Sequence, residues 1–111
     1  MGALTTRATE LADELNTLGV RAVSDPADAL VNLPCVLVAP PRVDYRAKAI
    51  TWRLLVLGPG PGTLAGWTAV DTLLDALEAE VPLETAEPAT YQLPNLGEPV
   101  ACYIATYTET T

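Results

Sequence analysis

The stretch that decides the fold is Val43–Leu57, VDYRAKAITWRLLVL. Polar and apolar side chains alternate along it, as in a β-strand whose two faces differ. One face carries Lys48, Ile50, Trp52, Leu54 and Val56, and the other carries Ala49, Thr51, Arg53, Leu55 and Leu57. About eleven residues at roughly 3.3 Å each predict a strand of roughly 36 Å, longer than most strands. Because its early half is the more polar, we expect this strand to leave the body of the domain as an arm.

An amphipathic helix is predicted before this segment, over Thr5–Leu18. Its apolar residues recur every three or four positions, which places them on one stripe of a helix. They are Leu4, Ala8, Leu11, Leu15 and Leu18. Gly19 is expected to end the helix.

A second amphipathic helix is predicted after it, from Leu64 to Val81. The turn Gly58–Gly62 and the cap residue Thr63 lead into it, and Pro82 closes it. The buried stripe is expected to contain Trp67, Val70, Leu73, Leu74, Leu77 and Val81. Asp71, Asp75 and Glu78 are expected on the outer, solvated side.

The remaining elements are short. A strand at Val20–Val23 is followed by one helical turn at Ser24–Asp28, where Ser24 fits a cap position. The apolar strand Cys35–Ala39 is expected to end at Pro40-Pro41, because proline cannot donate to a strand ladder. Thr90–Leu93 and Val100–Thr108 are predicted as strands joined by the turn Pro94–Pro99.

These elements predict an α+β fold with one domain over residues 1–111. We expect a mixed or antiparallel sheet of about five strands packed against two helices, in the order αβ(short α)ββαββ. Half of the residues are hydrophobic but only 18% are charged. A surface with so few charges suggests that part of it is buried against another molecule.

The charge balance excludes some classes of partner. Fourteen acidic residues against six basic ones give a net charge of −8, which disfavours nucleic acid as a ligand. The start Met1–Arg7 shows no secretory signal, and the apolar runs Cys35–Ala39 and Leu54–Leu57 are too short to span a bilayer. We expect a protein that is made inside the cell and does not enter a membrane.

The residue types needed for catalysis are missing or isolated. The sequence has no histidine, and its only serine, Ser24, has no base partner. Cys35 and Cys102 lie in apolar strands and are expected to be buried thiols. Acidic pairs such as Asp71 with Asp75 fall on solvated faces, and two prolines remove backbone donors from the Gly58–Gly62 turn. We therefore expect no enzyme activity, no cofactor and no metal.

Basic residues are concentrated in one place. Arg42, Arg46, Lys48 and Arg53 are four of the six basic residues, and Tyr45 lies among them. One interpretation is a solvated hairpin tip whose charges protect an edge strand. The other is a basic contact arm that reaches an acidic surface of a neighbouring copy. For the second interpretation, the candidate interface residues are Arg42, Tyr45, Arg46 and Lys48 on one side and Asp71, Asp75 and Glu78 on the other.

Taken together, these features resemble the tail terminator proteins of long, non-contractile-tailed bacteriophages, the group of minor tail protein U. The Ala-, Thr- and Pro-rich, histidine-free composition is similar to that of phages of high-GC actinobacterial hosts. The matching segments are the helix Thr5–Leu18, the strand Cys35–Ala39 before Pro40-Pro41, the strand Lys48–Leu57, the Gly/Pro turn into helix Leu64–Glu80, and the C-terminal strand ending Tyr103-Ile104-Ala105-Thr106-Tyr107.

The resemblance implies a virion protein that forms a six-fold ring at the head-proximal end of the tail. Such a ring docks on the last ring of major tail tube subunits, stops their polymerisation and presents a surface to the head-side connector. The genome passes through its lumen without specific binding. Two alternatives remain open: another head–tail neck or head-completion protein, and a small ferredoxin-like ligand-binding or regulatory domain, which would need a pocket with convergent polar groups.

Overall fold

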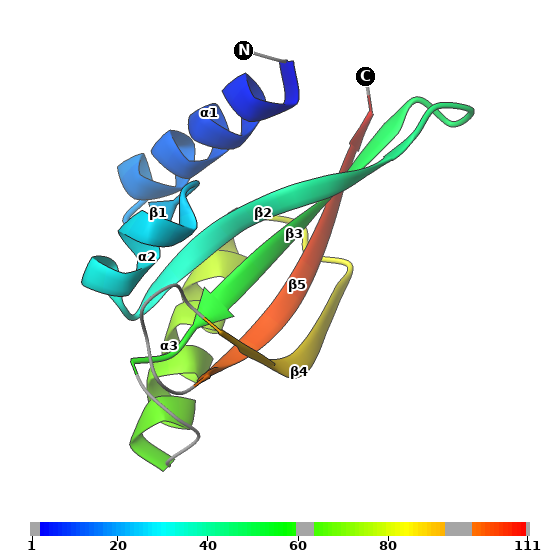
Figure 1. Cartoon of the computed structure of the whole chain (residues 1–111). Coiled ribbons are helices and arrows are strands. Elements are labelled where there is room, and N and C mark those ends of the chain that lie inside the picture. Colours follow the sequence, from blue (N-terminus) through cyan, green and yellow to red (C-terminus); the bar gives the residue numbers. More distant parts are fainter. Residues whose placement is uncertain (1–2, 60–63, 93–98, 111) are drawn as a thin grey trace.

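The computed structural model describes residues 3–59, 64–92 and 99–110, with only the backbone for 30–32 and 64–65. The elements follow the order expected from the sequence (Figure 1). They are α1 (Ala3–Thr17), β1 (Ala22–Val23), α2 (Pro26–Asn32), β2 (Cys35–Asp44), β3 (Ala49–Leu57), α3 (Leu64–Glu80), β4 (Thr85–Tyr91) and β5 (Val100–Thr110). The fold is α+β, as predicted, with three helices and an open mixed sheet of five strands.

The strands lie in the order β1-β2-β3-β5-β4. Only β1 and β2 are parallel neighbours; β2 with β3, β3 with β5 and β4 with β5 are antiparallel. Since β3 and β4 both run against β5, they are parallel to each other, and α3 connects them around β5. This is a split β-α-β unit, the building block of ferredoxin-like layouts, although this chain begins with a helix.

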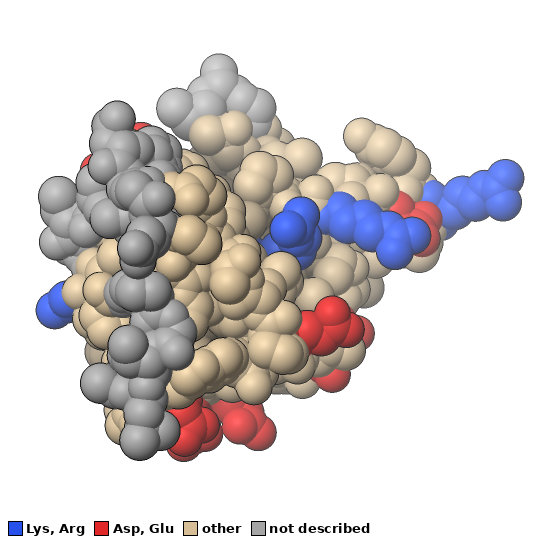
Figure 2. All heavy atoms as spheres, turned by 60° about the horizontal axis from the view of Figure 1, so that its bottom comes forward, with Lys and Arg blue, Asp and Glu red and all other residues tan. Residues whose placement is uncertain are grey.

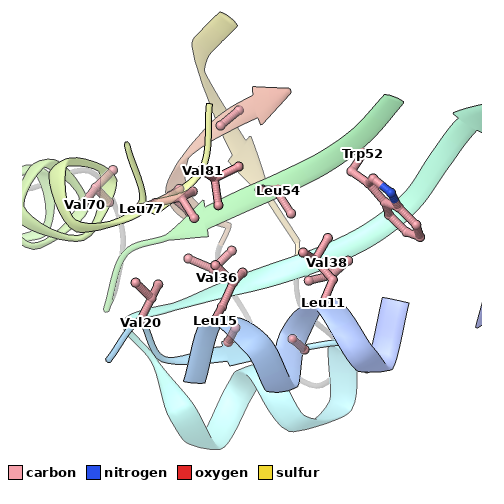
Figure 3. Packing of buried hydrophobic residues seen from close by; sticks show 14 residues of the cluster. Leu11, Leu15, Val20, Val36, Val38, Trp52, Leu54, Val70, Leu77 and Val81 are labelled. Atoms are coloured by element: carbon pink, nitrogen blue, oxygen red, sulfur yellow. The ribbon is translucent and has the colours of Figure 1, made fainter. Parts of the chain in front are cut away.

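The main core lies between the sheet and the helices α1 and α3, which cover the same face. Leu11 and Leu15 of α1 point toward Val36 and Val38 of β2, while α3 supplies Val70 and Leu77 (Figure 3). The apolar stripes predicted for these helices are therefore buried against the sheet. They contact every second residue of the strands, because alternate side chains point to the same face. A second cluster occupies the opposite face, where Ala29 of α2 packs with Cys35, Leu37, Leu55, Leu57 and Cys102.

The prediction that Pro40-Pro41 ends a strand is wrong. β2 continues to Asp44, and its pairing with β3 shifts between Ala39 and Arg42, so both prolines lie opposite one residue. This is a β-bulge. The prolines are tolerated because β1 pairs only with Val36 and Leu37, which leaves the rest of β2 at the sheet edge.

The long strand predicted over Val43–Leu57 is consequently two strands and a turn. Val43 and Asp44 end β2, residues 45–48 form the turn, and β3 begins at Ala49. The turn residues Tyr45 and Arg46 are polar, as expected for the early half of the predicted strand. The pattern therefore continued across the turn by coincidence and indicated a single strand. The arm is thus a two-stranded hairpin.

Three smaller predictions also need correction. β4 begins at Thr85, five residues before the expected start, because Pro88 fits an edge strand. Asp25, not Ser24, is the N-cap of α2, and its side chain accepts a hydrogen bond from the backbone N–H of Ala27. Trp67 remains 37% exposed, although the stripe placed it in the core.

Parts of two predicted turns lie outside the described residues, namely 60–62 of Gly58–Gly62 and 94–98 of Pro94–Pro99, together with the cap residue Thr63 and the strand end Leu93. Within residues 3–59, 64–92 and 99–110, none of the helices is long and apolar enough to cross a membrane.

Candidate functional site: a basic hairpin tip and an acidic helix

The β2–β3 hairpin projects from the body of the molecule (Figure 1). The chain measures 41 Å along its longest axis and 28 and 26 Å along the other two, so the shape is elongated. α1 and α3 cover the other part of the sheet and leave the turn at residues 45–48 uncovered. The tip of the hairpin is therefore exposed and stands apart from the helices.

The conformation of the tip is set by its own residues. One carboxylate oxygen of Asp44 accepts hydrogen bonds of 3.0 Å from the backbone N–H groups of both Arg46 and Ala47. This is an Asx turn, which replaces backbone partners at the point where the chain reverses. Lys48 closes the turn with a φ of 53°, in the left-handed region. The turn is thus closed by hydrogen bonds from its own backbone to the Asp44 side chain.

The predicted basic residues do gather at this tip. Arg42, Arg46 and Lys48 are exposed, and Tyr45 is 85% exposed. Arg42 pairs with Thr51, so Arg42 and Arg53 share one face of the hairpin. An exposed tyrosine among arginines is typical of a protein-contact surface, because a rigid aromatic ring provides contact area with little loss of side-chain entropy.

The predicted acidic residues lie elsewhere. Asp71, Asp75 and Glu78 are all exposed on α3, as expected. Figure 2 shows basic side chains along the projection and acidic side chains on the body below it. The structure groups each predicted set by itself and does not bring the two sets together within one chain.

A groove beside α3 was missed by the sequence analysis. The rings of Trp67 and Tyr103 meet edge to face, with centroids 5.6 Å apart and planes at 83°. Together with Thr68, Asp71 and Leu74 they line a hollow of about 340 Å³. A second hollow of about 210 Å³ shares Leu74 and continues past Glu78, Leu83, Glu84, Thr85 and Ala86. We call these two hollows together the Trp67 groove.

The helix pattern contained a partial signal for this groove. Asp71 follows Trp67 by four residues and so occupies the same side of α3. Because Asp71 was expected to face solvent, its position next to Trp67 conflicts with full burial of that side. The partner ring, Tyr103, comes from β5 and was not visible from local periodicity.

The two cysteines lie in the interior, as predicted. Burial raises the pKa of the Cys35 thiol to about 11, and it also raises the pKa of Cys102. The Cys35 thiol donates a weak hydrogen bond to the backbone oxygen of Ala29 at 3.9 Å. Both thiols therefore stay protonated near neutral pH and are poor nucleophiles. In the described part of the chain, no three Cys, Asp or Glu side chains gather where they would hold a metal ion.

Comparison with known proteins adds no relative: no family model matches the sequence, no curated protein is similar to it, and no solved structure matches the fold.

Proposed function

We propose that this protein is a structural virion protein that assembles head to tail into a ring, as a tail terminator at the head-proximal end of a long phage tail. The observation that carries the proposal is the separation of a projecting basic tip from an acidic helix in the same chain. The proposal assigns the protein no reaction, cofactor or metal.

Charge separation of this kind favours a contact between unlike patches, the basic tip of one copy and the acidic helix of another. In a two-fold dimer this contact would form twice, reciprocally, and assembly would stop at two copies. In a head-to-tail contact the basic tip of one copy meets the acidic helix of the next. Repeated head-to-tail contacts close into a ring when the rotation between copies allows it. The resemblance to tail terminators favours six copies.

The edges of the sheet support contact through the hairpin and not through strand addition. Pro40 and Pro41 interrupt the exposed edge of β2, and Pro88 lies in the edge strand β4. Proline has no N–H to offer an incoming strand, so both edges are poor templates for extending the sheet. Copies of this chain are therefore expected to meet by side-chain contacts.

In the proposed role, one side of the ring stops growth of the tail tube and the other binds head-side connector proteins. A net charge of −8 on each copy gives the ring a negative field, which lets a genome pass without adhering. Negative-stain images of purified tails and heads distinguish this role from that of a head-completion protein. A terminator stays on free tails, whereas a head-completion protein stays on heads.

The decisive experiment reverses the charge of the tip. We expect the purified protein to form a ring at micromolar concentration and the triple variant Arg42→Glu, Arg46→Glu, Lys48→Glu to remain monomeric, as measured by mass photometry. Arg46→Glu alone is compared with Arg21→Glu, which makes the same charge change at an exposed site away from the hairpin. We expect Arg46→Glu to lose assembly and Arg21→Glu to assemble like the wild type. A wild-type protein that stays monomeric in solution and in virion assemblies, or a triple variant that assembles normally, contradicts the proposal.

A further inference from the structure

We propose that the Trp67 groove of one copy is the receptor for the hairpin tip of the next copy. This inference rests on the proposed head-to-tail assembly and names its contact site. It replaces a general acidic helix face with a specific groove and adds two aromatic residues that sequence reasoning did not assign.

The groove is lined by both aromatic and acidic side chains. Trp67 and Tyr103 supply aromatic surface, and Trp67 is 37% exposed in the single chain. Asp71 lines the first hollow, and Glu78 and Glu84 line the second. Such a surface suits a ligand that carries both cations and an aromatic ring, since cations bind to carboxylates and to the faces of aromatic rings.

The hairpin tip has this composition. It presents an almost fully exposed Tyr45 between Arg42 and Arg46, on a turn held by Asp44. Outside the hairpin strands and their turn, the sequence contains only two other basic residues, Arg7 and Arg21. Arg7 is already engaged with Glu109 and Glu14. Among the described surfaces, the tip therefore combines an exposed aromatic ring with clustered basic side chains, the chemistry that suits the groove.

The tip cannot enter the groove of its own chain. The turn lies next to Ala49 at the start of β3, whereas Tyr103 pairs with Val56, seven residues further along the same strand. Seven residues of strand span about 23 Å. Because the paired strands hold this separation rigidly, a tip that occupies a Trp67 groove belongs to a second copy. The geometry favours head-to-tail assembly over self-closure.

The fluorescence of Trp67 provides a direct test. The sequence has two tryptophans, and Trp52 is fully buried, so Trp67 is the one whose environment changes when the groove is covered. We expect the emission to shift to shorter wavelength as rings form on concentration, and we expect Trp67→Phe to abolish the shift. Rings that form with no change in Trp67 emission would overturn the groove assignment and leave the proposed function intact.

Disulfide trapping tests the same contact without disturbing either aromatic ring. The exposed residues Ala47 at the tip and Thr68 at the groove are replaced by cysteine in separate variants, which are then mixed under mild oxidation. We expect a cross-linked pair from Ala47→Cys with Thr68→Cys. The matched control replaces Thr68→Cys by Thr17→Cys, at the exposed end of α1, and is expected to give none. The native cysteines are buried and do not compete.

Tyr45→Ala is a third test of the same contact. Because Tyr45 is exposed at the tip, its replacement leaves the core untouched. We expect it to weaken assembly by about tenfold or more, while Tyr45→Phe retains most of it. Rings that cross-link equally in the control mixture and tolerate Tyr45→Ala would show that another surface joins the copies. A protein without any ring would overturn this inference and the proposed function together.

Discussion

The guanidinium of Arg7 donates two hydrogen bonds, each 3.0 Å long, to the two carboxylate oxygens of Glu109, 102 residues further along the chain. The same carboxylate accepts hydrogen bonds from the indole N–H of Trp52 at 2.7 Å and from the hydroxyl of Tyr107 at 3.1 Å. These four side chains join α1 to β3 and β5 at the end of the sheet that carries the hairpin. The hydrogen bonds from Arg7 lower the pKa of Glu109, and those to Glu109 raise the pKa of Arg7.

Replacement of this carboxylate should destabilise the fold. In Glu109→Gln the amide NH2 faces the donors of Arg7, Trp52 or Tyr107, so at least one donor loses its acceptor. We expect a decrease in unfolding free energy of ~1–3 kcal/mol, measured by urea denaturation. The matched control is Glu10→Gln, because Glu10 lies 3.8 Å from Arg7 but is 59% exposed. It should cost less than ~0.5 kcal/mol, and an equal loss in both variants would argue against a special role for Glu109.

The same network predicts how stability depends on pH. The pKa of Glu109 in the folded protein lies below its ordinary value of 4.5. The stabilisation from the ionised form is therefore complete above that ordinary value and is lost as the pH falls through the lowered pKa. The stability difference between wild type and Glu109→Gln should shrink on acidification from pH 6 toward pH 2. A difference that is independent of pH over this range would contradict the assignment.

The left-handed residue in the hairpin turn can be tested by substitution. Lys48 has a φ of 53°, which costs roughly 1 kcal/mol for a residue with a side chain and almost nothing for glycine. Lys48→Gly should therefore leave thermal stability unchanged or slightly raised, whereas Lys48→Val should lower it. Differential scanning calorimetry measures both. Equal melting temperatures for the two variants would mean that the turn relaxes to another conformation.

Gly58 is restricted by contact and not by its backbone angles. A Cβ atom there would lie 3.0 Å from Cγ2 of Val70 and 3.2 Å from the backbone oxygen of Ala101, and the N–H of Gly58 already bonds that oxygen at 2.8 Å. Gly58→Ala should cost ~1–3 kcal/mol, because α3 must move away from the sheet. The second variant Gly58→Ala, Val70→Ala tests the cause: the Gly58 penalty should be smaller in the Val70→Ala background. An undiminished penalty would show that the backbone contact dominates.

Local periodicity was sufficient for much of the fold. The residues Leu11, Leu15, Val70 and Leu77 recur at helical spacing, and all four are buried in the structure. The order of helices and strands and the α+β class followed from such patterns, because each element must bury one face whatever its partner is. The basic hairpin and the acidic face of α3 were also visible, since charge is carried by residue type.

Other features depended on residues that are distant in the sequence. Pro40 and Pro41 continue a strand only because that part of β2 lies at an edge and can bulge. Trp67 meets the ring of Tyr103, which belongs to a strand that follows it by more than thirty residues. The sequence by itself determined which side chains must be buried and where charge accumulates. The tertiary structure alone decided which of them meet. Pairing across a sheet joins residues at irregular separations along the chain, and a periodic sequence pattern does not reveal such pairs.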